Sequence, residues 1–115
     1  MPRHARIVVK GLAHHVTQRG NKKQRVFFSH DDREFFLEKL LKYSTLARLQ
    51  IVSYCLMDNH THLIVVPEDS KSLSATFKPL HMVYSQRLNK KSKLFGRNWQ
   101  GRYFSSPMGK RVTSP

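Results

Sequence analysis

The chain has 115 residues, of which 21 are Lys or Arg and 7 are Asp or Glu, which gives a formal charge of +14. This length fits one domain, residues 1–115, and leaves no room for a second hydrophobic core. The composition excludes an internal disulfide, because Cys55 is the single cysteine, and no apolar run approaches the length of about 18 residues that a membrane span needs.

The surplus of positive charge points to a polyanionic partner, because so many like charges repel one another unless a polyanion binds them. Nucleic acid is the first interpretation. An acidic membrane surface is the rival, but no segment reads as a basic amphipathic helix with an aromatic anchor face. Residues 1–6 lack the long apolar region of a secretory signal, so we expect a cytoplasmic protein that does not contact membranes.

Residues 1–10 are basic around a short apolar patch and read either as a flexible arm or as an ordinary docked terminus. Residues 11–19 show the alternation typical of a first strand. A turn at 20–25 follows and carries a glycine, an amide and three cations. Composition alone does not separate a loop that contacts phosphates or bases from a solvated basic turn.

The next segment predicts a helix that ends near Arg48. Asp31 is the expected N-cap, with Glu34 at the reciprocal position of a capping box. Apolar residues recur along one face at helical spacing, which predicts packing against the core. That face consists of Phe36, Leu40, Tyr43 and Ala47, widened by Leu37 and Leu41.

Two apolar strands are predicted next, at 49–57 and 60–66, joined by a polar turn at Asp58 and Asn59. Cys55 in the first strand is expected to be a small buried hydrophobic residue. Asn59 either orients a neighbouring histidine or caps the turn, and the turn role is preferred.

His60 and His62 stand out in the second of these strands. Because side chains alternate across a strand, both project from the same face, with Cα atoms about 6.5 to 7 Å apart. Two imidazoles at that separation can converge on one divalent cation. The ordinary interpretation is a pair of partly exposed polar residues near a strand end.

Apolar residues at helical spacing from 73 to 88 predict a second helix, whose outer face is rich in lysine and arginine. Pro79 lies inside it and should kink or restart the helix, because its ring removes one backbone donor. Tyr84 lies on the apolar face of this helix, where a buried core tyrosine is the usual outcome.

Aromatic residues alternate with arginines and glycines in residues 95–104. Trp99 or Tyr103 could stack unpaired bases there while Arg97 and Arg102 neutralise phosphates. The alternative is an ordinary last strand at 102–106 with Trp99 in the core, and for Trp99 the two interpretations carry equal weight. Residues 107–115 are expected to form a loose tail.

The predicted order strand, helix, strand, strand, helix, strand is the split βαβ pattern of ferredoxin-like α+β proteins. An antiparallel sheet would then have both helices on one face. The other face would be left for His60 and His62.

Three segments in this order resemble the HUH tyrosine transposases of bacteria, especially the REP-associated branch. They are His15-Val-Thr-Gln-Arg-Gly-Asn21, Leu56-Met-Asp-Asn-His-Thr-His-Leu63 and Asn98-Trp-Gln-Gly-Arg-Tyr103. Two departures are Asp58, where the family more often has proline, and Thr61, where it usually has a hydrophobic residue.

The resemblance implies that the histidine pair binds Mg²⁺ or Mn²⁺ and that a tyrosine attacks a phosphodiester of single-stranded DNA, which leaves a 5′-phosphotyrosine and a free 3′-OH. It also implies a single-stranded or hairpin DNA partner and favours DNA contacts for the basic turn. A homodimer is left open. The predicted DNA contacts are Arg19, Asn21, Lys22, Lys23, Arg25, Arg97, Trp99, Arg102 and Tyr103.

In the family the nucleophile follows the Trp-Gln-Gly-Arg-Tyr segment, on a further helix that also supplies a third metal ligand. Residues 108–115 are too short and too rich in Gly, Ser and Pro for such a helix. We therefore expect a truncated or frameshifted chain that lacks the nucleophile, with Tyr84 as the one helical substitute. Water, a substrate phosphate, His14 or His15 would complete the metal coordination.

Two other functions are compatible with the same sequence. One is a DNA-hairpin-binding module that carries out no chemistry. The other is an RNA-binding domain of the RRM kind, which shares the order of elements and the basic charge. The second is less favoured, because His60 and His62 occupy the strand on which stacking aromatic rings would be expected.

Overall fold

The computed structural model describes residues 7–92 and 98–108. Its elements follow the predicted order: β1 is His14–Arg19, α1 His30–Ala47, β2 Leu49–Leu56, β3 His60–Pro67, α2 Ser72–Ser92 and β4 Phe104–Pro107. A short 3₁₀ turn, Asn21–Lys23, follows β1. Within these residues no helix is long and apolar enough to cross a membrane.

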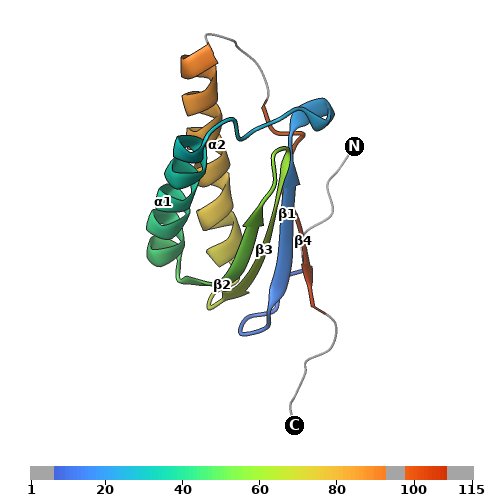
Figure 1. The fold of residues 1–115 in the computed structure, drawn as a ribbon. Helices are drawn as coiled ribbons and strands as arrows, with labels where there is room; N and C mark the ends of the chain where they lie inside the picture. Colours follow the sequence, from blue (N-terminus) through green and yellow to red (C-terminus); the bar gives the residue numbers. More distant parts are fainter. Residues whose placement is uncertain (1–6, 93–97, 109–115) are drawn as a thin grey trace.

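The four strands form one antiparallel sheet in the order β2-β3-β1-β4. Both helices lie on the same side of this sheet, and the other side is open (Figure 1). This is the arrangement of a ferredoxin-like α+β fold, so the predicted fold is confirmed.

Alternation along β1 and β3 determines which side chains face the helices. In β1, His14, Val16 and Gln18 are buried, and in β3 the buried residues include Leu63 and Val65. The intervening residues point to the open face and are only half-buried. The period of two therefore places the core on the helix side and the histidines of β3 on the other.

Aromatic residues dominate the core between the sheet and the helices. Phe27, Phe36 and Phe77 have no exposed surface, and neither does Tyr84. Trp99, from the loop before β4, packs against this cluster with its ring 5.8 Å from that of Tyr84. The core thus joins both helices to the segment that precedes the last strand.

The start of α1 differs from the prediction. Ser29, not Asp31, is the N-cap, and its hydroxyl accepts a hydrogen bond from the Asp32 N–H at 3.2 Å. The Asp32 carboxylate in turn accepts from the Phe28 N–H at 2.8 Å. A reciprocal cap therefore forms two residues earlier than expected, because Asp32 is drawn into the interior while Asp31 stays exposed.

Three further residues differ in part or in full from the expectation. Of the two outcomes expected at Pro79, a kink or a restart, the structure excludes the restart, since α2 runs through this residue from Ser72 to Ser92. Cys55 is exposed rather than buried, because β2 is an edge strand and Cys55, paired with His62, lies on the face that no helix covers. The exposed Leu41 likewise falls outside the buried face of α1.

Both ends of the described chain are tied to the sheet. The N–H of Val9 donates to Nε2 of His14 at 3.1 Å, and the N–H of Met108 donates to the carbonyl of Ala13 at 2.9 Å. Residues 1–6, 93–97 and 109–115 lie outside the described residues. Most of the expected arm and tail falls there, and so does Arg97.

Candidate metal and nucleic-acid site

His60 and His62 lie together on the open face of the sheet, at the start of β3. Their ring centroids are 4.8 Å apart and the rings are nearly perpendicular, at 88°. Thr61 between them points the other way and is 1% exposed. The strand thus presents two imidazoles side by side, as the spacing predicts.

The hydrogen bonds of His60 determine its tautomer. Its Nδ1 lies 2.7 Å from Oδ1 of Asn59, and an amide oxygen only accepts, so Nδ1 carries the hydrogen. The amide nitrogen of Asn59 donates to the carbonyl of Lys23 at 3.2 Å, which fixes the orientation of the amide. In the neutral ring Nε2 of His60 then bears a free lone pair, the form in which imidazole binds a metal.

His62 has a third imidazole as its partner. Its Nδ1 lies 3.1 Å from Nε2 of His15, and the two rings are stacked at 8° with centroids 5.3 Å apart. One hydrogen is shared between these atoms. When His62 donates it, Nε2 of His62 is free to bind a cation, and when His15 donates it, Nε2 of His62 is blocked.

The surroundings of His62 favour its neutral form. Partial burial lowers the pKa of this imidazole below its ordinary value, and the neighbouring His60, His15 and Arg19 lower it further. A neutral ring is the form that a metal requires, because a protonated imidazole has no lone pair to give. At neutral pH His62 is therefore uncharged, and it can bind a cation through Nε2 in the tautomer in which it donates to His15.

The donor set limits the kind of cation that fits. Among the residues that the structure describes, no group of three or more His, Cys, Asp or Glu side chains is placed to hold a metal. His14 does not complete the set, because it faces the helices with both ring nitrogens bonded, to Leu12 and Val9. Two imidazoles alone suit Mn²⁺ better than Mg²⁺, which prefers oxygen ligands.

Three adjoining hollows surround the histidine pair. The central one, of about 290 Å³, contains His60 and His62 with Arg19 and Lys23. It shares Arg19 with a hollow of about 390 Å³ that reaches Arg102, and it shares His60 with a third hollow of about 480 Å³. Because neighbouring hollows share lining residues, we refer to the three together as the histidine groove.

The histidine groove is basic along its whole length. Its cations are Arg19, Lys23, Arg25, Arg33 and Arg102. Asp58 is the one carboxylate among the described residues that line it, and this residue pairs with Arg33 at 2.8 Å and Arg25 at 3.8 Å. No ion pair with a described residue holds Arg19, Lys23 or Arg102.

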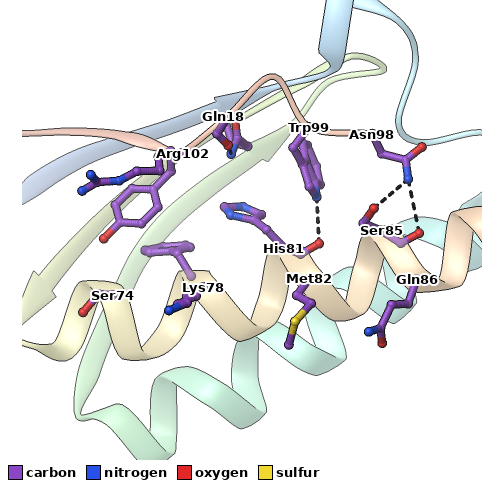
Figure 2. Close-up of a pocket in the computed structure, with 13 residues that line it drawn as sticks. Gln18, Ser74, Lys78, His81, Met82, Ser85, Gln86, Asn98, Trp99 and Arg102 are labelled. Carbon is purple, nitrogen blue, oxygen red and sulfur yellow. Dashed lines mark hydrogen bonds between the residues drawn. The ribbon is translucent and has the colours of Figure 1, made fainter. Parts of the chain in front are cut away.

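The structure therefore gathers some of the predicted DNA contacts and separates others. Arg19, Lys23, Arg25 and Arg102 line the histidine groove, whereas Trp99 is 5% exposed and Tyr103 is 6% exposed. The indole Nε1 of Trp99 donates to the carbonyl of His81 at 3.0 Å (Figure 2). For Trp99 the structure thus matches the core interpretation.

The remaining predicted contacts belong to the basic turn beside the groove. Lys22 is exposed and adopts a left-handed backbone conformation, with φ of 57°. Asn21 is half-buried, and its N–H donates to the carbonyl of Asn98 at 2.9 Å. The turn is thereby fixed to the loop that precedes β4.

Sequence reasoning missed two residues of the site. Phe104 lines one end of the histidine groove and is 63% exposed, although it begins a strand. His15 was named only as an optional metal ligand, yet it bonds directly to His62. The alternation of β1 places His15 on the same face as Arg19 and could have indicated its position once β1 was paired with β3.

Tyr84, the proposed substitute nucleophile, is a core residue in this structure. It has no exposed surface, and its hydroxyl donates to the carbonyl of Val26 at 2.5 Å. Burial raises the pKa of this phenol, and the charge of Asp32 raises it further. An attack on DNA by this oxygen would require both the hydrogen bond and the packing around α2 to be broken.

Replacing Tyr84 with phenylalanine is therefore expected to lower the free energy of unfolding by about 1 to 2 kcal/mol, because the buried carbonyl of Val26 loses its partner. Urea denaturation measures this loss. Mn²⁺ binding should be unchanged. Unchanged stability together with loss of a metal-dependent reaction on DNA would instead make Tyr84 a nucleophile.

Fold and site together define a class of protein: a ferredoxin-like α+β domain that carries paired imidazoles in a basic groove on its open sheet face. A family model described as IS200-like transposase matches residues 8–114. The chain therefore belongs to the IS200-like transposase family, and the resemblance inferred from the three sequence segments is confirmed.

Solved structures with the same fold include two transposase-related proteins. One is a REP-associated tyrosine transposase bound to a REP hairpin, with a TM-score of 0.66 and 17% identity over 96% of this chain and 64% of that chain. The other is a candidate transposase from Deinococcus radiodurans R1, with a TM-score of 0.65 and 16% identity over 95% of this chain and 88% of that chain. No curated protein matches the sequence.

Proposed function

We propose that this chain is the metal-binding and DNA-binding part of a transposase that acts on single-stranded DNA, with a folded hairpin as the DNA partner. The observation that carries the proposal is the pair of imidazoles in the histidine groove. His60 has a tautomer that leaves Nε2 free, and His62 is kept neutral by its surroundings. A site prepared in this way is suited to a divalent cation next to a DNA phosphate.

The residues of the groove divide into two roles. His60 and His62 would hold Mn²⁺ or Mg²⁺, and a bound cation would neutralise charge that develops on a phosphodiester. Arg19, Lys23 and Arg102 would hold phosphates on either side of that point. Asn59 and His15 would orient the two imidazoles.

The reaction that we propose is a tyrosine transesterification. The phenol gives up its proton as its oxygen forms a bond to phosphorus, the bond from phosphorus to the 3′ oxygen breaks, and the 3′ oxygen takes up a proton and leaves as a hydroxyl. None of Tyr43, Tyr54, Tyr84 and Tyr103 lines the histidine groove as the structure describes it. We therefore propose that the attacking phenol is supplied from outside the described residues.

The placement of the tyrosines also favours a second candidate, a module that binds hairpin DNA and carries out no chemistry. The two candidates differ in whether a covalent product forms. A denaturing gel of the protein incubated with a single-stranded DNA hairpin and Mn²⁺, with and without a relative that supplies the tyrosine, distinguishes them. An adduct under either condition supports the transposase, and a DNA complex without any adduct supports the binding module.

DNA binding itself has a measurable salt dependence. We expect the affinity for a single-stranded DNA hairpin to fall with a slope of about −2 in a plot of log K against log salt. Roughly 0.7 counterions are released per phosphate, and three cations of the groove, Arg19, Lys23 and Arg102, have no ion pair with a described residue. Fluorescence anisotropy with a labelled hairpin measures this slope. Arg19→Ala should make it shallower by about 0.7.

Lys42→Ala is the matched control, because Lys42 is an exposed cation of α1 that lines none of the hollows of the histidine groove. This variant should leave the slope unchanged. Equal affinity for an RNA hairpin of the same sequence would favour the RNA-binding interpretation. A slope near zero would contradict binding through the groove.

A further inference from the structure

A second cavity lies on the other side of the sheet from the histidine pair. It has a volume of about 760 Å³ and lies between α2 and the segment that carries Trp99 and Arg102 (Figure 2). This volume is in the range of sites for small molecules, roughly 300 to 1,000 Å³. We call it the α2 cavity.

The α2 cavity adjoins the histidine groove. Gln18, Gly101 and Arg102 line both the cavity and the neighbouring hollow of the groove. The short segment of Gly101 and Arg102 is thus a rim shared by the two. A DNA strand that leaves the groove over this rim reaches the cavity without crossing the sheet.

His81 supplies a hydrogen-bonding group that faces the cavity. The side chain is 8% exposed and lies against Trp99, with ring centroids 4.9 Å apart, and against Phe77, at 5.7 Å. No hydrogen bond joins its ring nitrogens to a residue of the described chain, although the indole of Trp99 bonds its backbone carbonyl. These nitrogens are not among the fully buried polar atoms that lack a partner, so they reach the open space of the cavity, where a ligand can bond them.

The imidazole of His81 is also neutral. Burial lowers its pKa to about 3, so around neutral pH one ring nitrogen donates a hydrogen bond and the other accepts one. This combination of donor and acceptor is complementary to the edge of a nucleobase. A simple anion fits this pair of nitrogens less well, because it only accepts hydrogen bonds.

The rim of the cavity carries positive charge. Lys78 and Arg102 are both exposed there, and no carboxylate is found among the described residues that line the cavity. Met82, one turn after Lys78 on α2, is 55% exposed and offers an apolar surface at the entrance. A ligand with a negative charge and a flat, largely apolar ring fits this combination.

We propose that the α2 cavity binds one unpaired nucleotide of the DNA, with its base next to His81 and its phosphate between Lys78 and Arg102. The proposal rests on DNA as the partner of the histidine groove. It adds a second contact that holds a single base, on the far side of the shared rim. Such a contact would let the protein select a hairpin that has an unpaired base at a fixed distance from the cation.

Trp99 provides a local probe of the cavity, because it is the single tryptophan of the chain. We expect titration with each of the four deoxynucleoside monophosphates to change its fluorescence in a saturable way, with at least one base preferred by about threefold or more, as a single additional hydrogen bond would give. Inorganic phosphate is the comparison. If it binds as tightly as every mononucleotide, the base is not recognised and the proposal fails.

Two variants separate the parts of the site. Lys78→Glu should weaken mononucleotide binding about tenfold by reversing the charge at the rim. His81→Phe keeps an aromatic ring but removes both nitrogens, so it should abolish the preference among bases. Lys42→Glu makes the same change of charge on α1 and should have no effect on mononucleotide binding.

The outcomes are distinguishable from those for the histidine groove. Failure of all four mononucleotides to bind, while the DNA hairpin and Mn²⁺ still bind, would overturn the nucleotide site and leave the proposed function in place. A hairpin in which one unpaired nucleotide is replaced by an abasic residue should lose affinity in the parent protein but not in His81→Phe. An equal loss in both proteins would contradict a base contact at His81.

Discussion

Replacement of His60 and His62 together by alanine is expected to weaken Mn²⁺ binding by more than about 100-fold, because loss of a group that merely orients a ligand already costs roughly 10- to 100-fold. Isothermal titration calorimetry measures the affinity. Both side chains are half-buried on the open face of the sheet, so the fold should persist. Unchanged Mn²⁺ affinity in this double variant would exclude the pair as the metal site.

A graded comparison tests whether the neighbours of the pair have the role that the hydrogen bonds indicate. Asn59→Ala keeps both imidazoles but frees Nδ1 of His60 from the acceptor at 2.7 Å. A mixture of tautomers then results, and we expect a loss of Mn²⁺ affinity of about tenfold. If the parent binds Mn²⁺ most tightly, Asn59→Ala less tightly and the double variant least tightly, the result supports ligands that are oriented by their neighbours. A loss in Asn59→Ala as large as in the double variant would mean that the turn itself has collapsed.

Mg²⁺ provides a check on the chemistry of the donors. Two nitrogen ligands favour Mn²⁺, whereas Mg²⁺ keeps its water and oxygen ligands. The parent protein without DNA should therefore bind Mn²⁺ more tightly than Mg²⁺. Equal affinity for the two ions would indicate that oxygen ligands outside the described residues dominate the site.

Much of the fold could be predicted because patterns of period two report burial directly. The alternation of His14, Val16 and Gln18 places these three residues on the helix side of the sheet, and the same rule places His60 and His62 on the open side. The pairing of β1 with β3, which brings Thr17 opposite His62, then assembles the site. These features depend on local sequence and on one strand register.

The features that were missed depend on contacts between distant residues. Ser29 and Asp31 are equally acceptable N-caps by residue type, and the choice is made by Asp32, whose carboxylate is held by Arg87 and Lys91 from α2. No window around residue 30 contains those two cations. A helix boundary can therefore be decided by an element that lies more than fifty residues further along the chain.

The same holds for Cys55 and Trp99. Cys55 is surrounded by apolar residues in the sequence, but it is exposed because β2 lies at the edge of the sheet and its open face has no cover. Trp99 lies among arginines and glycines, but α2 offers it a carbonyl partner and an aromatic neighbour in His81. The residues next to a side chain in the sequence predict its burial poorly when its surroundings are made by tertiary contacts.

The Asp32 carboxylate has the largest expected effect on stability. It has no exposed surface and accepts hydrogen bonds from the Phe28 N–H, from Lys91 at 2.8 Å and from Arg87 at 3.2 Å. Asp32→Ala should lower the free energy of unfolding by about 3 kcal/mol. This loss is at the low end of the range for removing one partner of a buried ion pair. The low end applies because Lys91 and Arg87 are partly exposed and water can solvate them once the carboxylate is gone. Urea denaturation at pH 7 measures the loss.

Glu38→Ala is the matched control, because Glu38 is an exposed carboxylate of the same helix. Its removal should change the free energy of unfolding by less than about 0.5 kcal/mol. A comparable loss in both variants would mean that the negative charge of α1 as a whole, rather than the buried contact of Asp32, stabilises the fold.

The contribution of Asp32 should also depend on pH. Burial of this carboxyl favours its neutral form, but the hydrogen bonds from Lys91 and the Phe28 N–H, with the charges of Lys91 and Arg87, outweigh burial and hold its pKa below the ordinary value of 3.8. A pKa that is lower in the folded state gives stability that is complete above the unfolded value and is lost as the pH falls through the folded one. The difference in unfolding free energy between the parent and Asp32→Asn should therefore be constant near neutral pH and shrink once the pH drops below 3.8. A difference that stays the same in acid would show that Asp32 stabilises the two helices as a neutral hydrogen-bonding group rather than as an anion.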